Sequence, residues 1–141
     1  MRLWRAPPDG SCFFHSVGFH TGIPASALRA ICVRLLLEQA EKSYNGLTLR
    51  EWVHAETGKK LSEYAKALHR GFWGGTLEAK LLADHFKRPI VIYGDLAKKS
   101  SAGTEANRLL TVLPHPWPPV GECGRPICLL YTGSSHYDAL I

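Results

Sequence analysis

The chain has 141 residues, which is enough for one ordinary domain and too short for two, so we expect residues 1–141 to form a single compact domain. Its composition, 45% hydrophobic and 21% charged residues, excludes a disordered or fibrous protein. The formal net charge of +5 arises from Lys and Arg residues that are spread along the sequence rather than clustered, so we do not expect nucleic-acid binding.

Neither a membrane span nor a secretion signal is visible in the sequence. The leucine run at 35–37 is bounded by Arg34 and Glu38, far short of the roughly 20 apolar residues that a membrane span requires. The N-terminal segment leads into Pro7 and Pro8 without the apolar core of a signal peptide. We therefore expect no membrane association and an intracellular location, in the cytoplasm or nucleus of a eukaryotic or host cell.

The cysteine pattern predicts free thiols. Cys12, Cys32, Cys123 and Cys128 are scattered and lie mostly in apolar surroundings, which is typical of a reducing compartment rather than of a disulfide framework. Cys123 and Cys128 are not followed by a second ligand pair at zinc-finger spacing, so we expect no metal site.

Helix signals dominate the first half of the chain. The Asp9-Gly10-Ser11 tripeptide predicts a turn, and the apolar residues after it predict a helix with Cys12 in its first turn. Beyond Pro24, apolar residues recur at helical spacing up to about Gln39. Shorter helices are predicted where capping signals precede apolar runs, from Thr48, from Ser62 to a stop at Gly71, and from a cap at Thr76 through Phe86.

Strand signals follow in the second half. Short β-rich runs at residues 90–93, 109–113 and 127–131 are bounded by Gly, Pro or polar residues, the pattern of buried strands. Residues 136–141 predict a fourth strand. Helices first and strands later indicate an α+β domain in which helices pack against a small sheet.

A thiol near the start and an imidazole near the end of the chain suggest nucleophilic catalysis. Cys12 becomes a nucleophile only if a base or a positive field favours its thiolate. The N-terminus of a helix would lower its pKa and offer free N–H groups to an oxyanion. If residues 136–141 form a strand, His136 and Asp138 point to the same side, where the carboxylate can orient the imidazole.

Three segments together resemble the ovarian tumour (OTU) cysteine proteases, which remove ubiquitin and ubiquitin-like modifiers from proteins. Residues 9–17 resemble the nucleophile motif of that family, Trp73-Gly74-Gly75 with Glu78 its central motif, and residues 136–140 its histidine motif. Their order matches and they span nearly the whole chain. The resemblance implies a papain-like α+β fold with helices against a small, mostly antiparallel sheet. One departure is Ser11, where the family commonly has Asn.

The resemblance assigns roles to individual residues. It implies Cys12 as nucleophile, His136 as general base and Asp138 as the carboxylate that orients the histidine. Asp9 is a second acidic candidate, for which we favour bracing the loop, so the third member of the triad stays open between Asp9 and Asp138. The implied oxyanion donors are the N–H groups of Gly10, Ser11 and Cys12. The substrate-binding residues implied around the modifier's Gly-Gly tail are Trp73, Gly74, Gly75 and Tyr137.

The implied reaction is hydrolysis of the isopeptide bond after the C-terminal Gly-Gly of the modifier, through a thioester on Cys12 and without a cofactor. The implied partners are ubiquitin or a ubiquitin-like modifier and polyubiquitin chains, and we expect the protein to act as a monomer. Two alternatives stay open. The chain is either another papain-like Cys-His hydrolase, such as a cell-wall peptidase or an amidase, or an inactive domain that binds ubiquitin without cutting it.

Overall fold

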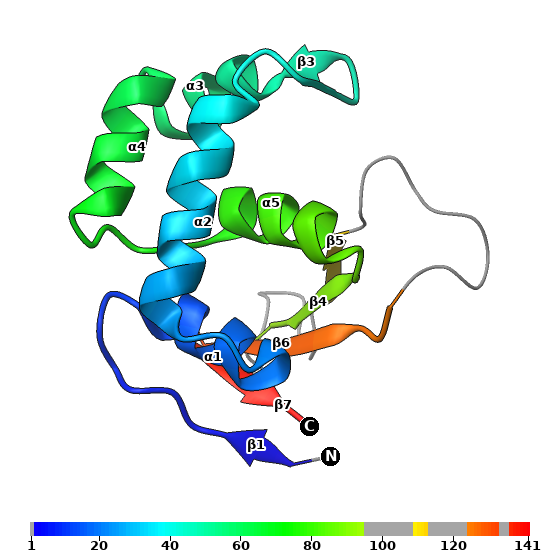
Figure 1. The fold of residues 1–141 in the computed structure, drawn as a ribbon. Helices are drawn as coiled ribbons and strands as arrows, with labels where there is room; N and C mark the ends of the chain where they lie inside the picture. The colour runs from blue at the N-terminus through cyan, green and yellow to red at the C-terminus, as the bar shows by residue number, and fades with distance from the viewer. Residues whose placement is uncertain (1, 95–108, 113–123, 133–135) are drawn as a thin grey trace, which may run out of the picture.

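The computed structural model describes residues 2–94, 109–112, 124–132 and 136–141. Helices occupy most of the first part and strands the second (Figure 1), which confirms the predicted α+β class. The helices are α1 (Cys12–Thr21), α2 (Ala25–Glu38), α3 (Leu49–Thr57), α4 (Leu61–His69) and α5 (Thr76–Phe86). The strands are β1 (Leu3–Trp4), β2 (Ser43–Tyr44), β3 (Leu47–Thr48), β4 (Ile90–Tyr93), β5 (Leu109–Val112), β6 (Ile127–Thr132) and β7 (His136–Leu140).

The main sheet brings the two ends of the chain together. Its strand order is β1-β7-β6-β4-β5, and every neighbouring pair is antiparallel except β4 with β6. Leu3 of β1 pairs with Leu140 of β7, so the termini lie side by side in Figure 1. The chain leaves β1 and reaches α1 within a few residues, which places the start of α1 beside the strand that begins with His136.

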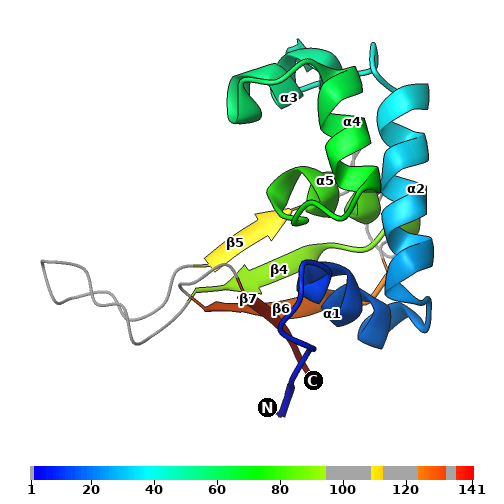
Figure 2. The same cartoon turned by 90° about the vertical axis from the view of Figure 1, so that its left-hand side faces the viewer.

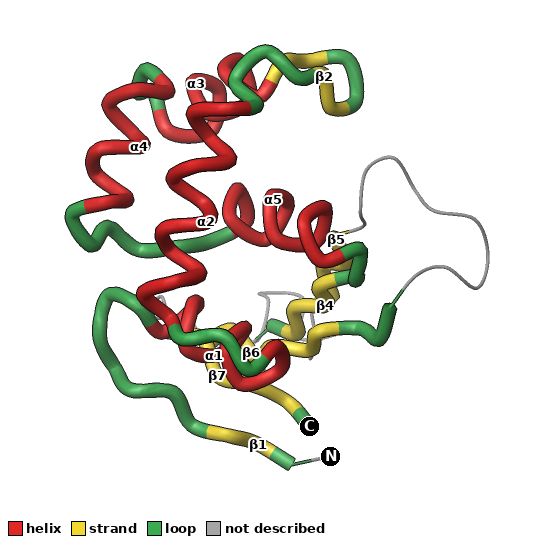
Figure 3. The backbone as a smooth tube through the Cα atoms, in the orientation of Figure 1, coloured by secondary structure: helices red, strands yellow, loops and turns green. Residues whose placement is uncertain are grey.

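Helices cover the sheet and extend away from it. Helix α1 packs against β6 and β7, and α5 packs against β4 and β5 (Figure 2). Helix α2 contacts α1 at one end and continues along α4 and α5 toward α3 (Figure 3). The core between these layers is apolar, and its fully buried members include Phe14, Val17, Leu28, Leu36, Leu68, Leu82, Ile127 and Leu129.

Several element boundaries differ from the predicted ones. Helix α4 begins at Leu61 rather than at Ser62, with Lys60 at its N-cap. Helix α5 includes Thr76 as its first residue, and Gly75 is the N-cap. The N-cap lacks a side chain, and the Glu78 carboxylate instead accepts a hydrogen bond from the Gly75 N–H at 2.8 Å, so a Thr76 hydroxyl cap is not needed.

The shortest strands were not predicted, because a strand of two residues is too short to show a hydrophobic periodicity. This applies to β1 and to the β2–β3 hairpin, whose turn residues Asn45 and Gly46 both have positive φ, 51° and 90°. The predicted strand at 109–113 is present as β5, and Leu113 lies outside the described residues. Within the described ranges, no helix is both long enough and apolar enough to cross a membrane.

Three of the four cysteines lie in the described part of the chain. Cys12, Cys32 and Cys128 are free thiols, the first two of them buried, as predicted. Cys123 lies outside the described residues. Among the residues that the structure describes, no three His, Cys, Asp or Glu side chains are grouped as metal ligands.

Candidate active site

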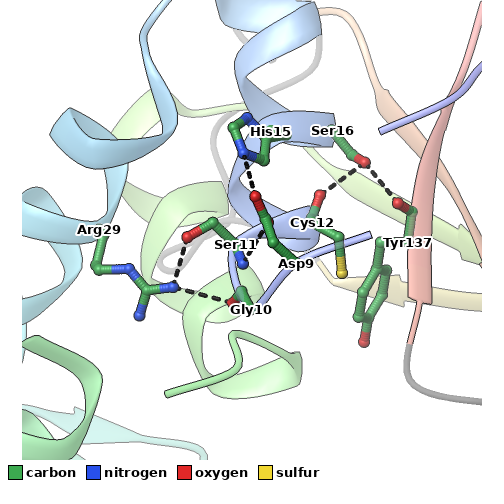
Figure 4. A network of polar contacts seen from close by, with 8 residues as sticks. All are labelled: Asp9, Gly10, Ser11, Cys12, His15, Ser16, Arg29 and Tyr137. Atoms are coloured by element: carbon green, nitrogen blue, oxygen red, sulfur yellow. Dashed lines mark hydrogen bonds and ion pairs between the residues drawn. The ribbon is translucent and has the colours of Figure 1, made fainter. Parts of the chain in front are cut away.

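The loop before α1 is shaped by Asp9. Its Oδ1 accepts a hydrogen bond from the Ser11 N–H at 2.9 Å, and its carbonyl accepts one from the Cys12 N–H at 3.2 Å. The second carboxylate oxygen lies 3.4 Å from His15 Nε2, one turn into the helix (Figure 4). These are the contacts that a bracing role for Asp9 requires, and they hold Cys12 as the first residue of α1.

Cys12 is held against β7 by backbone and hydroxyl contacts. The buried Ser16 hydroxyl, one turn further along α1, lies 2.9 Å from the Cys12 carbonyl and 3.0 Å from the Tyr137 carbonyl (Figure 4). The Tyr137 backbone also forms a hydrogen bond to the Cys12 thiol. The thiol therefore lies beside the residue that directly follows His136.

The Cys12 thiol is buried, and its ionisation is disfavoured. Its residue is 1% exposed, and burial raises the pKa of the thiol, with a smaller raising effect from the Asp9 charge. Hydrogen bonds from the backbone at Tyr137, Phe13 and Cys12 lower the pKa but do not outweigh burial. The prediction that the helix N-terminus leaves Cys12 with a lowered pKa is therefore wrong, because burial leaves the pKa raised.

His136 and Asp138 lie on one face of β7, as strand alternation predicted. His136 Nε2 is 2.8 Å from Asp138 Oδ1, and the same oxygen accepts a hydrogen bond from the Ala6 N–H at 2.8 Å. Asp138 is buried, whereas the His136 side chain is 25% exposed. With Nε2–H directed to the carboxylate, Nδ1 is the ring nitrogen left to exchange a proton with another group. Asp138, and not Asp9, is thus the carboxylate in contact with His136.

Two of the three predicted oxyanion donors already form hydrogen bonds within the nucleophile loop. The Ser11 and Cys12 N–H groups both donate to Asp9. The Gly10 N–H forms no hydrogen bond within the described part of the chain. Gly10 therefore offers a donor as it stands, while oxyanion binding by Ser11 and Cys12 stays a prediction that needs their hydrogen bonds to be exchanged.

The central motif lies against the nucleophile helix. A Cβ built on Gly74 would approach ring carbons of Phe13 and Phe14 to 2.9 Å, and one on Gly75 would lie 3.9 Å from the Tyr137 hydroxyl. Only a residue without a side chain fits at Gly74 without displacing these rings. Trp73 is 44% exposed, so it does not fill the core. The three predicted segments are therefore brought together in space.

Glu78 is a buried carboxylate beneath this motif. It accepts hydrogen bonds from the Gly75 N–H at 2.8 Å and from the Tyr64 hydroxyl at 2.6 Å. Burial raises the pKa of Glu78 to about 7, although these hydrogen bonds and the Arg29 charge lower it. Glu78 is therefore a buried cap of α5, and its pKa lies close to neutral pH.

We expect the stability of the protein to depend on pH through Glu78. Because the folded pKa of about 7 exceeds the ordinary 4.5, the protonated carboxyl is favoured in the folded state. The stabilisation that Glu78 provides is fully present below about pH 4.5. As the pH rises through about 7, the free energy of unfolding falls by roughly 3 kcal/mol. Glu78→Gln keeps an oxygen for Gly75 and should remove this loss. Urea unfolding between pH 5 and 8 measures the difference between the two proteins.

The matched control for Glu78→Gln is Glu63→Gln. Glu63 is exposed and caps α4 in the same way, accepting a hydrogen bond from the Lys60 N–H at 3.2 Å. This variant measures how stability changes when the charge of an exposed capping carboxylate is removed. If the stability difference between the parent and Glu78→Gln were the same at pH 5 and pH 8, the raised pKa of Glu78 would be contradicted.

Two residues of the site were not predicted from the sequence. Ser16 joins α1 to β7, and its only sequence signal is a polar residue one turn after Cys12 among apolar neighbours. Arg29 is buried on α2 and donates hydrogen bonds to the Gly10 carbonyl and the Ser11 hydroxyl (Figure 4). The signal for Arg29 was a charged residue directly after the core residue Leu28, which by itself reads as a surface position.

A cavity in the described part of the chain lies away from these residues. Its volume is about 570 Å³, and it is formed by α3, α4 and the turn between them. None of the predicted site residues lines it.

Comparison with known proteins agrees with this arrangement. The family model of OTU-like cysteine proteases matches residues 7–138. The RNA-directed RNA polymerase L of Crimean-Congo hemorrhagic fever virus (strain Nigeria/IbAr10200/1970) is 30% identical over 139 residues, which is 96% of this chain. The chain spans only 3% of the length of that polymerase.

Solved structures share the fold. The Hazara virus OTU bound to ubiquitin has a TM-score of 0.67 at 24% identity, and the match covers 99% of this chain and 80% of that chain. An OTU deubiquitinase from Wolbachia pipientis wMel, also bound to ubiquitin, has a TM-score of 0.67 at 14% identity, over 99% of this chain and 94% of that chain. The resemblance carried by the three motifs is confirmed by the family match, and the protein belongs to the family of OTU-like cysteine proteases.

Proposed function

We propose that the protein is a cysteine-type deubiquitinase that hydrolyses the isopeptide bond after the C-terminal Gly-Gly of ubiquitin or a ubiquitin-like modifier. The observation that carries the proposal is the His136–Asp138 pair, with Nε2 and Oδ1 2.8 Å apart, on the strand against which Cys12 is held. Ubiquitin as the partner is supported by the Hazara virus and Wolbachia OTU proteins, both solved with ubiquitin bound.

The raised pKa of Cys12 makes the general base essential to the proposed reaction. Because burial raises the pKa of the thiol, we propose that the thiol keeps its proton until sulfur attacks the glycine carbonyl, when the proton passes to His136 Nδ1. Asp138, bonded to Nε2–H, stabilises the imidazolium that results. The imidazolium then protonates the leaving lysine amine, and water hydrolyses the remaining thioester with His136 again as base.

The negative oxygen of the tetrahedral intermediate is proposed to meet N–H groups of the nucleophile loop. The Gly10 N–H donates to no group within the described part of the chain, and the Ser11 and Cys12 N–H groups become available if the oxyanion replaces Asp9 as their acceptor. One such donor contributes about 3 kcal/mol in comparable acyl-transfer sites. Asp9 accordingly has a bracing role rather than the role of third triad member.

The modifier tail is proposed to lie in an extended form along the central motif. Trp73 flanks the tail, and the Gly74 and Gly75 backbone lies along it. The missing Cβ of Gly74 lets this segment pack closely on Phe13 and Phe14, and the missing Cβ of Gly75 leaves space toward the Tyr137 hydroxyl. The Tyr137 hydroxyl, near Gly75, forms part of the opposite wall. A channel of this kind accepts two glycines and excludes larger residues.

The proposal also covers the organisation and setting of the enzyme. Residues 1–141 are taken as one catalytic domain, which acts where ubiquitin conjugates occur, inside a eukaryotic or host cell. The 30% identity to part of a viral polymerase polypeptide supports a catalytic domain that relatives carry within larger proteins.

The decisive experiment is reaction with ubiquitin whose C-terminal glycine is replaced by a thiol-reactive group. We expect a covalent adduct on Cys12, identified by mass spectrometry, and no adduct with Cys12→Ala. A control carries the same reactive group on an unrelated short peptide. If Cys12 reacts with iodoacetamide but not with the ubiquitin probe, another papain-like hydrolase is the correct reading. Ubiquitin binding with neither labelling nor cleavage indicates an inactive binding domain.

A further inference from the structure

Arg29 joins two segments that are distant in sequence. It is nearly buried on α2, and its guanidinium donates in two directions. Nη2 donates to the Gly10 carbonyl at 3.0 Å and to the Ser11 hydroxyl at 2.9 Å. Nη1 donates to the Leu68 carbonyl at 2.7 Å and to the Phe72 carbonyl at 2.6 Å. A single side chain is therefore bonded both to the loop before Cys12 and to the turn after α4.

These two segments lead into two different motifs of the proposed site. Gly10 and Ser11 directly precede Cys12, and Phe72 directly precedes Trp73. The segments also touch, because a Cβ built on Gly10 would lie 2.9 Å from the Gly71 carbonyl oxygen. The distance between the nucleophile loop and the central motif is thus set at this junction, where Arg29 bonds both sides.

The junction requires the shape of arginine rather than only its charge. A planar guanidinium can address four acceptors at once, whereas a lysine ammonium is a compact point charge on a flexible stem. The Arg29 guanidinium also lies over the Phe14 ring, 4.7 Å from its centroid. Burial lowers the pKa of Arg29, and the Glu78 charge raises it. The position of the Arg29 side chain is therefore determined by its four hydrogen-bond acceptors and by the Phe14 ring.

We propose that Arg29 is a positioning residue for the hydrolysis, because it fixes the spacing between the nucleophile loop and the Trp73-Gly74-Gly75 segment. The tail of the modifier is held by that segment, and Arg29 sets how far its scissile carbonyl lies from Cys12. Misplacement of reacting atoms by about 1 Å can lower a rate roughly 100-fold. The inference rests on the proposed function for its substrate.

The test compares Arg29→Lys and Arg29→Met with two controls on the same helix. Arg34→Met removes an exposed arginine, and Leu36→Ala leaves a cavity in the core two helical turns away. The kcat and KM for release of a fluorophore from the ubiquitin C-terminus are measured below the unfolding temperature of every variant. Hydrogen exchange of residues 10–13 and 70–75 is measured on the same proteins.

We expect both Arg29 variants to lose roughly 10- to 100-fold in kcat, with KM changed less than about threefold, since the surface that binds the modifier's body is untouched. Both controls should keep kcat within about twofold, although Leu36→Ala is destabilised. Faster hydrogen exchange should be confined to the two segments in the Arg29 variants. If Arg29→Lys matched the parent in kcat, charge rather than spacing would be responsible and the proposal would be overturned.

A second variant covers the case in which the Arg29 variants do not fold. Ser11→Ala removes one of the four contacts while keeping Arg29, and we expect a smaller loss of kcat together with faster hydrogen exchange of residues 10–13. If Ser11→Ala kept both the parent kcat and the parent hydrogen exchange at residues 10–13, the proposal would be overturned. If the parent itself does not cut ubiquitin, the proposed function fails, and the hydrogen-exchange comparison still tests the junction.

Discussion

Replacing Cys12 with alanine should abolish cleavage of diubiquitin, with a loss of roughly 10⁴-fold or more, while ubiquitin binding persists. The loss is large because the proposed acyl intermediate forms on the Cys12 sulfur, and removing one member of such a catalytic unit removes most of its effect. Cleavage is measured with purified diubiquitin, and binding by calorimetry with monomeric ubiquitin.

Cys32→Ala is the matched control for this substitution. Cys32 is also a buried free thiol, on α2, and burial raises its pKa well above the ordinary value. The same change of atoms is therefore made in the core without touching the site. We expect Cys32→Ala to lower stability and to keep the parent activity. Cleavage by Cys12→Ala at the parent rate would show that the nucleophile is another residue.

Local sequence signals located the parts of the site because each part depends on neighbouring residues. A turn tripeptide followed by apolar residues placed Cys12 at the first position of α1. Period-two alternation placed His136 and Asp138 on one face of β7, where they are bonded. The bracing contact of Asp9 with the Ser11 N–H likewise spans only two residues.

Properties that depend on packing between distant segments could not be predicted from local sequence signals. The pKa of Cys12 is raised by burial, which depends on packing rather than on neighbouring residues, and the Ser16 contact that holds α1 to β7 joins residues 121 positions apart in the sequence. Arg29 reaches acceptors 18 to 43 residues away on both sides of its helix. No local pattern distinguishes such a residue from an exposed helical arginine.

Cys12 and Arg29 together show how the fold turns separate motifs into one site. Helix α2 carries Arg29 between the nucleophile loop and the turn after α4, and the Ser16 hydroxyl links α1 to β7. The nucleophile is thus fixed from two directions by buried polar contacts, neither of which touches the sulfur. Substitutions of Arg29 or Ser16 should change the rate of the reaction without changing its chemistry.

Substitutions of His136 and Asp138 should have different effects on activity and on stability when both are measured on the same variants. We expect His136→Ala to lower cleavage by roughly 10⁴-fold and Asp138→Ala by a smaller factor, since an orienting carboxylate is the least sensitive member of such triads. Stability should follow the opposite order. His136 is partly exposed, whereas Asp138 Oδ1 also accepts the Ala6 N–H, and leaving that donor unpaired costs about 1–3 kcal/mol.

Asp138→Asn distinguishes the two roles of that carboxylate. Its amide oxygen can still accept from the Ala6 N–H and from His136 Nε2–H, so stability should return to the parent value, while the neutral amide no longer stabilises the imidazolium and activity stays low. Asp9→Ala completes the comparison, because Asp9 contacts the loop and His15 but not His136. If Asp9→Ala lost as much activity as His136→Ala while Asp138→Ala retained it, the orienting carboxylate would be Asp9, and the Asp138 contact would serve only to hold β7 to the segment that leads into α1.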